Sequence, residues 1–492
     1  MSLIGFPQAR AFAFTTALSS FGLTGCNSSS SNNAPSQTDT GSTSMYTDTM
    51  GGSSTSTGST GETDTTGETG ETGGGMECPY IERVSVSSFG TQANGESSGA
   101  LISGNGLFVV FYSSATNLVE NDVDGGGHYY LRDLQAGLTE IINVRPEGGS
   151  RGIVVSAISD DARYLAFRSE EADIVPDDTN DLADAFVYDR ETDITERVSV
   201  SSSGVQGNNR IDGFIGMSGD GRYVVFPSDS DNLVPNDTNA ASDIFVRDRN
   251  TDTTERVSVG LNGAEANGSS HFDPAISSNG RYVTFRSMAT NLVPDDTTIW
   301  EDVFVYDRDT GAMDRVSLST SGEESLGVNY VPMISAGGRF VSFASNAENL
   351  APIGAPGPDV FFRDRTEGTT KIISVAQDGT PGEWGGDYHT FNAATARYVA
   401  FMSNGSNLVP NDDNDAHDVF VYDRFNELLK RVSIGQDGQE ANGATSLSSW
   451  RHSFTLNGEF LLFSSAASNL IDADTNDAKD VFIIGMDCFF EE

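Results

Sequence analysis

Apolar and polar residues alternate in short runs along most of this chain, and the runs recur in the same order. In one copy they are Arg222–Phe226, Asp243–Asp248 and Glu255–Val259, each rich in Val, Ile, Phe or Thr. A shorter run precedes them, as Pro274–Ser277 does in the next copy. Because strand side chains point alternately to two faces, a period of two bounded by Gly, Asn, Asp and Pro predicts strands. We therefore expect four strands per copy.

The Asp that ends the third run marks the period of the repeat. It recurs at intervals of 56 to 59 residues, at Asp133, Asp189, Asp248, Asp307, Asp364 and Asp423. A seventh copy, Asp480–Met486, ends the repeat region. A fixed period with several short strands per unit is typical of radial or stacked repeat folds. The pattern predicts an all-β fold, a seven-bladed β-propeller of four-stranded antiparallel blades, over residues 78–492.

The two ends of the repeat region predict how the ring closes. The chain enters at Glu82–Val86, which matches the outermost strand of a blade, and leaves at Asp480–Ile484, which matches the third strand. We expect the N-terminal strand to complete the last blade, because this removes an open sheet edge. Cys78 and Cys488 lie where a hairpin joins these strands in other blades, so we infer a disulfide between them. Two free buried thiols are the alternative.

One element resembles a known family. Ser218–Phe226, which reads SGDGRYVVF, and Asp243–Asp248, which reads DIFVRD, resemble the WD40-like repeats of TolB-type periplasmic propellers. The resemblance covers about residues 80–488 and implies the blade fold, but propellers of this kind include both binding scaffolds and enzymes. The chain lacks the separate N-terminal α/β domain of TolB, so the protein partner of TolB is not implied.

The N-terminal part of the chain differs in composition from the repeats. Residues 1–26 contain a mostly apolar stretch and end in Leu23–Cys26, which resembles a bacterial lipoprotein signal with Cys26 as the lipidated residue. An ordinary cleaved secretion signal is the alternative, and the stretch is too short for a membrane span. Residues 27–77 are almost all Ser, Thr, Gly, Asn, Asp and Glu, which predicts a disordered tether. We expect a protein of the bacterial cell envelope, on the outer membrane or cell surface, that contacts the membrane only through its lipid anchor.

Charge limits the partners. The formal net charge is −43, and only a small part of it comes from the N-terminal segment. Nucleic acid is excluded as a partner, because phosphate binding needs a basic field. Cations, basic peptides and neutral glycans remain, so the expected partner is a protein or a glycan. We expect a monomer.

The most regular polar feature is the loop between the second and third strands, with the pattern Asn-Leu-Val-Pro-x-Asp-x-Asn-x-x-x-Asp. Calcium takes six to eight oxygen ligands, and alternating Asp and Asn on a tight loop could supply several. The alternative is that these side chains bond their own backbone and build the turn. Calcium is the only cofactor expected. Its candidate ligands are Asp178, Asn180, Asp184, Asp237, Asn239, Asp243, Asp412, Asn414, Asp418, Asp474, Asn476 and Asp480.

The copies differ most just before and along their innermost strands, which should line one mouth of the channel. Aromatic, His and charged residues gather there, as is typical of a ligand platform. The candidates are His271, Asp273, Tyr330, Tyr388, His389, Trp450, Arg451 and His452. Three interpretations stay open, namely side chains that plug the channel, a binding site, or acid–base partners such as His271 with Asp273.

No known catalytic motif accompanies these residues. The sequence has no Gly-x-Ser-x-Gly elbow, His-Glu-x-x-His helix, Walker loop or dinucleotide fingerprint. We therefore expect a lipoprotein propeller that acts as a binding scaffold rather than an enzyme, with calcium as a candidate ligand. The alternative is a hydrolase or lyase acting on polysaccharide or peptide at the propeller mouth.

Overall fold

The computed structural model describes residues 81–120, 127–145, 149–351, 357–383, 386, 389–391, 393–449 and 451–490. The chain divides into two units, residues 1–73 and 74–492, and every described residue lies in the second. The predicted signal with Cys26, the predicted tether and Cys78 lie outside the described residues, as does the side chain of Cys488. No helix of the described part is long and apolar enough to cross a bilayer.

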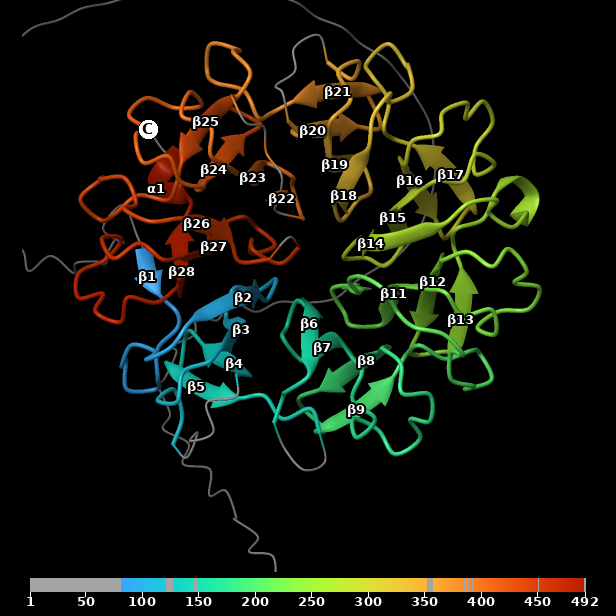
Figure 1. The fold of residues 1–492 in the computed structure, drawn as a ribbon, viewed down its shortest axis with the longest axis horizontal. Coiled ribbons are helices and arrows are strands. Elements are labelled where there is room, and N and C mark those ends of the chain that lie inside the picture. Colours follow the sequence, from blue (N-terminus) through green and yellow to red (C-terminus); the bar gives the residue numbers. More distant parts are fainter. Residues whose placement is uncertain are drawn as a thin grey trace, which may run out of the picture. The chain divides into compact units, whose positions relative to one another are not determined.

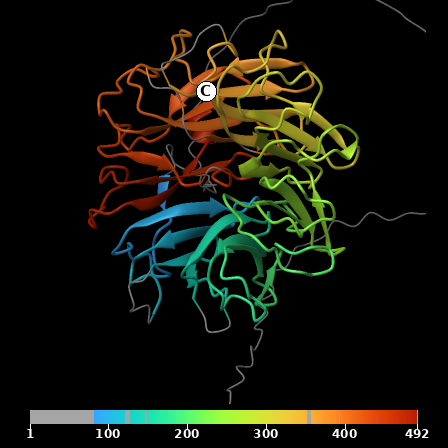
Figure 2. The ribbon, with the colours of Figure 1, turned by 45° about the vertical axis from the view of Figure 1, so that its right-hand side comes forward.

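Seven four-stranded antiparallel sheets surround a central axis (Figure 1). The innermost strand of each sheet lies nearest this axis, and the view turned by 45° shows the sheets packed face to face around it (Figure 2). The predicted seven-bladed, all-β propeller is confirmed.

The first six blades follow one another along the chain. Blade one is β2–β5 (Ser97–Ile102, Phe108–Ser113, His128–Asp133, Leu138–Ile141), blade two β6–β9 (Ile153–Ile158, Tyr164–Ser169, Asp184–Asp189, Ile194–Arg197) and blade three β10–β13 (Gly216–Met217, Tyr223–Ser228, Asp243–Asp248, Thr253–Arg256). Blade four is β14–β17 (Ser270–Ile276, Tyr282–Ser287, Asp302–Asp307, Ala312–Arg315), blade five β18–β21 (Asn329–Ile334, Phe340–Ser345, Asp359–Asp364, Thr369–Ile372) and blade six β22–β25 (His389–Phe391, Tyr398–Ser403, Asp418–Asp423, Leu428–Arg431).

Blade seven is built from both ends of the repeat region. It contains β26 (Thr445–Leu447), β27 (Phe460–Ser465), β28 (Asp480–Gly485) and, as its outermost strand, β1 (Ile81–Arg83). β1 pairs antiparallel with β28 and lies beside it in Figure 1. The N-terminal strand therefore completes the last blade, as the strand order of the sequence predicts. A short helix, α1 (Asp487–Phe490), follows β28.

Each blade buries one aromatic pair between its second and third strands. The two rings are stacked or tilted with centroids 5.4 to 6.1 Å apart, as in Phe285 with Phe304. Both rings of this pair are fully buried. Apart from Tyr130, they are the Phe residues of the repeated motifs, so the motif predicts the core directly. The pairs are Phe111–Tyr130, Phe167–Phe186, Phe226–Phe245, Phe285–Phe304, Phe343–Phe361, Phe401–Phe420 and Phe463–Phe482.

Removing one of these aromatic side chains should destabilise the whole propeller. We expect Phe304→Ala to lower the free energy of unfolding by about 3–5 kcal/mol, because it removes a buried ring and leaves a cavity. Ile299→Ala is the matched control, since Ile299 is 81% exposed and its loss should change stability by less than about 0.5 kcal/mol. Urea denaturation measures both, and equal values for the two variants would contradict this account of the core.

Arginines that recur at the start of the second strand pair with the Asp at the end of the third. Arg281 donates through Nε and Nη2 to both carboxylate oxygens of Asp307, at 2.8 and 2.7 Å. Blades two, three, five and six repeat this pair. A second recurrent Arg reaches the neighbouring blade, as Arg308 does to Glu255 at 2.6 Å. These arginines therefore join strands and blades.

The Arg–Asp pairs predict loss of stability in acid. The bound guanidinium lowers the pKa of Asp189, Asp248 and Asp307 to about 2. Since the folded pKa is depressed, this stabilisation is complete above the ordinary Asp pKa of about 4 and is lost as the pH falls towards 2. We expect denaturation midpoints to fall between pH 4 and 2, and to fall less steeply in Asp307→Asn. An unchanged slope in that variant would remove the pair as a cause.

Candidate functional site

The central channel holds a small cavity between the inner strands. Its volume is about 70 Å³, and apolar side chains from most blades form its walls. Among the described lining residues, the charged side chains are Asp160 of blade two and Arg451 of blade seven. The lining residues are Ile102, Gly104, Asp160, Gly216, Met217, Gly219, Ala275, Ile276, Ser278, Met333, Ile334, Phe391, Ala393, Arg451, His452, Phe454 and Leu456.

Turns between first and second strands narrow one end of this channel. The turns of adjacent blades hydrogen-bond to one another through their backbones, as in Asp160 N to Gly219 O at 2.8 Å and Gly219 N to Ser278 O at 2.9 Å. The Asp160 carboxylate accepts from Ser278 Oγ at 3.0 Å. A Cβ on Gly219 would lie 2.1 Å from it, and one on Gly104 2.4 Å. The glycines thus leave room for the single carboxylate of Asp160 at this end of the channel. Burial raises the pKa of Asp160.

Blade four carries a polar network near the other end of its inner strand. Nε2 of His271 lies 3.3 Å from Oε1 of Glu301, and Nη1 of Arg286 donates to Oε2 of Glu301 at 2.6 Å. Nη2 of Arg286 lies 3.6 Å from Oδ2 of Asp273. Burial raises the pKa of Asp273, while Arg451, Arg286 and His271 oppose that shift. The network therefore joins the ends of three strands of one blade.

Two aromatic rings flank this network. The Arg286 guanidinium lies over Phe272, 4.7 Å from the ring centroid, and 5.9 Å from the centroid of Tyr330. Phe272 is 38% exposed. It has a φ of +67°, a conformation that non-glycine residues rarely adopt, and the N–H of Phe214 donates to its carbonyl at 2.9 Å. Such strained positions occur preferentially at functional sites.

The predicted mouth residues thus fall into three groups. His271, Asp273 and Tyr330 lie at the blade-four network, and Arg451 and His452 line the cavity. His389 is fully buried in β22, and burial lowers its pKa to about 4. Tyr388 and Trp450 lie outside the described residues.

Arg451 and His452 reach the channel on a loop. β26 ends at Leu447, and pairing with β27 resumes where the N–H of Leu462 donates to the carbonyl of Ser453, so Arg451 and His452 lie outside the strands. Burial and the nearby Arg451 lower the pKa of His452 to about 4, so His452 is neutral at pH 7. The described part of blade seven therefore brings one positive charge into the channel.

The repeated Asp loops form a second kind of site, away from the channel. In each of five blades an Arg of the outermost strand lies between two carboxylates of the loop. Arg256, for example, lies 3.1 Å from both Asp237 and Asp243. The other sets are Asp178, Asp184 and Arg197; Asp296, Asp302 and Arg315; Asp412, Asp418 and Arg431; and Asp474, Asp480 and Arg83.

The asparagines of these loops build turns. Oδ1 of Asn239 accepts from the N–H of Ala241 at 2.9 Å, and its Nδ2 donates to Asp243 at 2.9 Å. Asn180, Asn414 and Asn476 bond the N–H two residues ahead in the same way. The amide oxygens are used by the backbone, so the carboxylates are the oxygens left for a cation.

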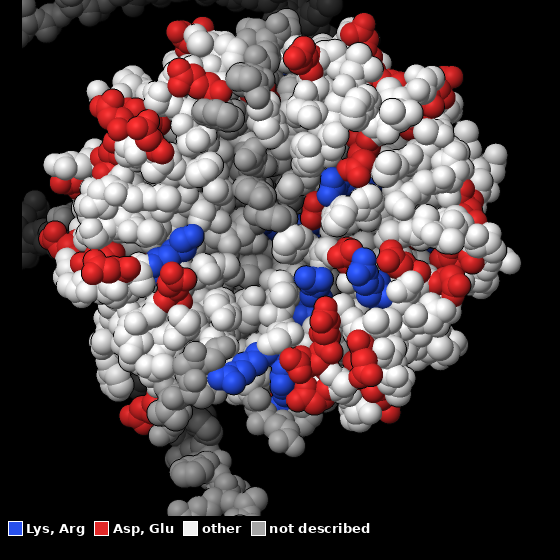
Figure 3. Space-filling view, in the orientation of Figure 1, with Lys and Arg blue, Asp and Glu red and all other residues white. Residues whose placement is uncertain are grey.

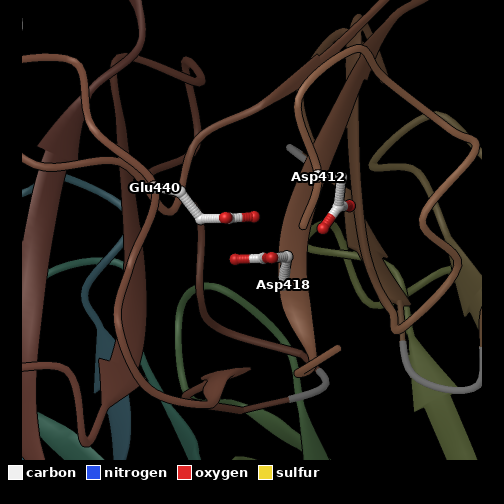
Figure 4. Close-up of side chains that lie close together, drawn as sticks. All are labelled: Asp412, Asp418 and Glu440. Carbon is white, nitrogen blue, oxygen red and sulfur yellow. The ribbon is translucent and has the colours of Figure 1, made fainter. Parts of the chain in front are cut away.

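In blades three, four and six a Glu adds a third carboxylate to the set around the Arg, and blade six brings the three close together. Oxygens of Asp412, Asp418 and Glu440 lie within 4.8 Å of one another (Figure 4), and Arg431 contacts all three. Burial chiefly, together with the negative neighbours, raises the pKa of Asp412 to about 7 against the opposing Arg431. In blade two Gln206 stands in place of Glu440 and donates to Asp178 and Asp184. Three oxygen donors around one Arg make a divalent cation possible here.

Sequence patterns missed the residues that complete both sites. Glu301 is specific to blade four, where blades two and three carry Ala183 and Ser242, whereas Arg286 has a counterpart in Arg168 of blade two. Comparing the copies position by position would have found this difference.

On the face seen in Figure 3, Lys and Arg side chains lie nearer the centre of the propeller than most of the Asp and Glu side chains.

The similarity of this chain to known proteins is a similarity of fold. No protein-family description matches the chain, and no curated protein matches it. An oligogalacturonate lyase structure from Vibrio parahaemolyticus is 12% identical, with a TM-score of 0.49 over 83% of this chain and 94% of that chain. An oligogalacturonate lyase in complex with manganese has a TM-score of 0.48 at 12% identity, over 83% and 93%. TolB from Acinetobacter baumannii is 14% identical, with a TM-score of 0.37 over 77% and 80%. Identities this low do not transfer a function to this chain.

Proposed function

We propose that the chain is a binding scaffold of the cell envelope that holds a glycan at the blade-four network. The lipid anchor and tether predicted at its N-terminus would display the propeller at a membrane surface, as a monomer. The observation that carries this proposal is the network itself, in which His271, Arg286 and Glu301 meet beside the partly exposed Phe272.

The chemistry of these groups suits a sugar. Sugar hydroxyls accept from guanidinium and donate to carboxylates, and sugar C–H faces pack on aromatic rings. Phe272 and Tyr330 supply rings, while Arg286, Glu301 and Asp273 supply fixed polar groups. Ligand sites typically combine apolar surface with a few oriented polar groups.

A panel of neutral, amino and acidic oligosaccharides titrated into the full chain tests the proposal. We expect one class to bind, and Phe272→Gly to weaken that binding about tenfold, which is 1.4 kcal/mol. Glycine suits the positive φ of this position, so the variant should fold at least as stably as the wild type. Phe89→Ala, which removes an 87% exposed ring elsewhere, is the control and should bind normally.

Two outcomes would count against a glycan scaffold. If no oligosaccharide of the panel bound, glycan binding would be refuted. Cleavage of the bound oligosaccharide, lost in His271→Asn, would instead establish the alternative of a hydrolase or lyase, with His271 and Glu301 as the acid–base pair.

Calcium at the Asp412–Asp418–Glu440 cluster is a second candidate function. Hard cations prefer oxygen ligands, and a cation would relieve the repulsion that helps to raise the pKa of Asp412. Arg431 already lies among these carboxylates, so a cation would compete with its guanidinium. Calorimetric titration with calcium should detect heat of binding at one site in the wild type and no binding in Glu440→Gln. Asp178→Asn, in the blade with Gln206, is the control and should leave calcium binding intact.

A further inference from the structure

Arg451 enters the central channel, and its guanidinium forms no hydrogen bond with the described residues. Its loop is held by backbone bonds, since Ile102 N donates to His452 O and Leu462 N donates to Ser453 O, each at 2.7 Å. Nε, Nη1 and Nη2 of Arg451 are all buried. Within the described part of the chain, none of the three has a hydrogen-bond acceptor.

A guanidinium in this state is costly to the folded protein. It presents five N–H donors, and each buried donor without an acceptor lowers the stability of the folded state. Asp273 attracts Arg451 electrostatically but forms its ion pair with Arg286. Burial consequently lowers the pKa of Arg451. A ligand that supplied acceptors would remove this cost.

The space beside Arg451 is small and mostly apolar. Gly216 has no side chain there, and a Cβ on it would lie 3.4 Å from Nη1 of Arg451. The cavity of about 70 Å³ is walled by Met217, Met333 and Phe454 among others. His452 is neutral at pH 7, so the positive charge next to this space is a single one.

We propose that the channel binds a small monocarboxylate, with its carboxylate on Arg451 and its short apolar chain against Met217, Met333 and Phe454. Bidentate pairing of guanidinium with carboxylate gives geometric specificity as well as strength. The cavity is smaller than the ~150 Å³ that accommodates a benzene ring, which limits the ligand to about two to four carbons. Asp160 at the turn end of the channel disfavours a second carboxylate.

Titration of the full chain with propionate, by calorimetry and saturation-transfer NMR at pH 7.5, tests the proposal. We expect propionate to bind and propionamide, its neutral isostere, not to bind. Arg451→Met should weaken propionate binding at least tenfold, and Arg451→Lys should weaken it less, because a lysine keeps the charge without the fork. Arg451→Met should melt no lower than the wild type, since it removes an unpaired buried charge.

The controls separate this site from others. Succinate should bind more weakly than propionate, and Asp160→Asn should narrow that difference. Equal binding of propionamide, equal binding of inorganic phosphate, or unchanged binding in Arg451→Met would overturn the proposal. A clearly lower melting temperature of Arg451→Met would do so too, by making Arg451 a structural residue. The inference does not rest on glycan binding, and Phe272→Gly should bind propionate normally.

Discussion

Deleting residues 81–86 from the full chain should abolish the cooperative native fold. The deletion removes β1, which pairs with β28, and with it the buried side chains of Ile81 and Val84. It would also leave the edge of β28 open to pairing with other chains. We expect an aggregating or partly unfolded protein, detected by size-exclusion chromatography and thermal melting. Deleting residues 27–32 of the predicted tether is the control and should leave the melt unchanged.

A point variant isolates the electrostatic part of this closure. Arg83 lies 3.2 Å from Asp474 and 3.2 Å from Asp480, and all three side chains are buried. Removing one partner of a buried ion pair costs about 3–5 kcal/mol, so Arg83→Met should be strongly destabilising. Arg256→Met breaks the equivalent contacts in blade three. A larger loss of stability in Arg83→Met would show that ring closure amplifies the local effect, whereas equal losses would show that it does not.

The architecture was predictable because every copy carries the same local signal. The repeated Phe of the second and third strands gives the core pairs, such as Phe226 with Phe245, directly. Boundaries were less exact. β11 begins at Tyr223 rather than Arg222, and the Arg222 side chain donates to the carboxylate of Asp248. Tertiary pairing of this kind is not visible in the alternation of one strand.

The irregular inner strands could not be predicted. β14 and β18 contain bulges, and Phe272 and Val331 there adopt φ values of +67° and +45°. Glycine normally marks such positions, and neither residue gives that signal. A prediction from sequence position alone assumes regular inner strands. The sequence analysis therefore grouped the buried His389 with residues of the cavity and the blade-four network.

The repeats also explain why the two kinds of site differ in predictability. The loop carboxylates, such as Asp412 and Asp418, recur and were found from their spacing. The sequence alone does not assign the arginine between them to this loop, because residue spacing does not show which strand folds back onto the loop. Glu301 occurs in blade four alone and lies directly before β16, while Arg286 lies on β15, so only the folded chain brings them to His271.

Replacing Asp412 should stabilise the protein at neutral and alkaline pH. The folded-state pKa of this carboxyl, about 7, lies above its ordinary value of about 4, so the folded state holds a proton that the unfolded state has lost. The stability contributed by this proton is therefore complete below pH 4 and is lost as the pH rises through 7. Asp412→Asn keeps the neutral form at every pH. We expect it to raise the free energy of unfolding by about 1–3 kcal/mol at pH 8 and to change it little at pH 4.

Urea denaturation from pH 4 to 8 measures this difference, and blade two supplies the comparison. Asp178→Asn alters the equivalent carboxylate where Gln206 replaces the third one, so it should stabilise less at pH 8. A loss of stability in Asp412→Asn at pH 8 would contradict the prediction. It would mean that the contact with Arg431, at 3.2 Å, outweighs the burial of the charge and the repulsion from Asp418 and Glu440. A gain would instead identify the blade-six cluster as a place where the fold retains unfavourable negative charge, the condition under which a bound cation adds stability.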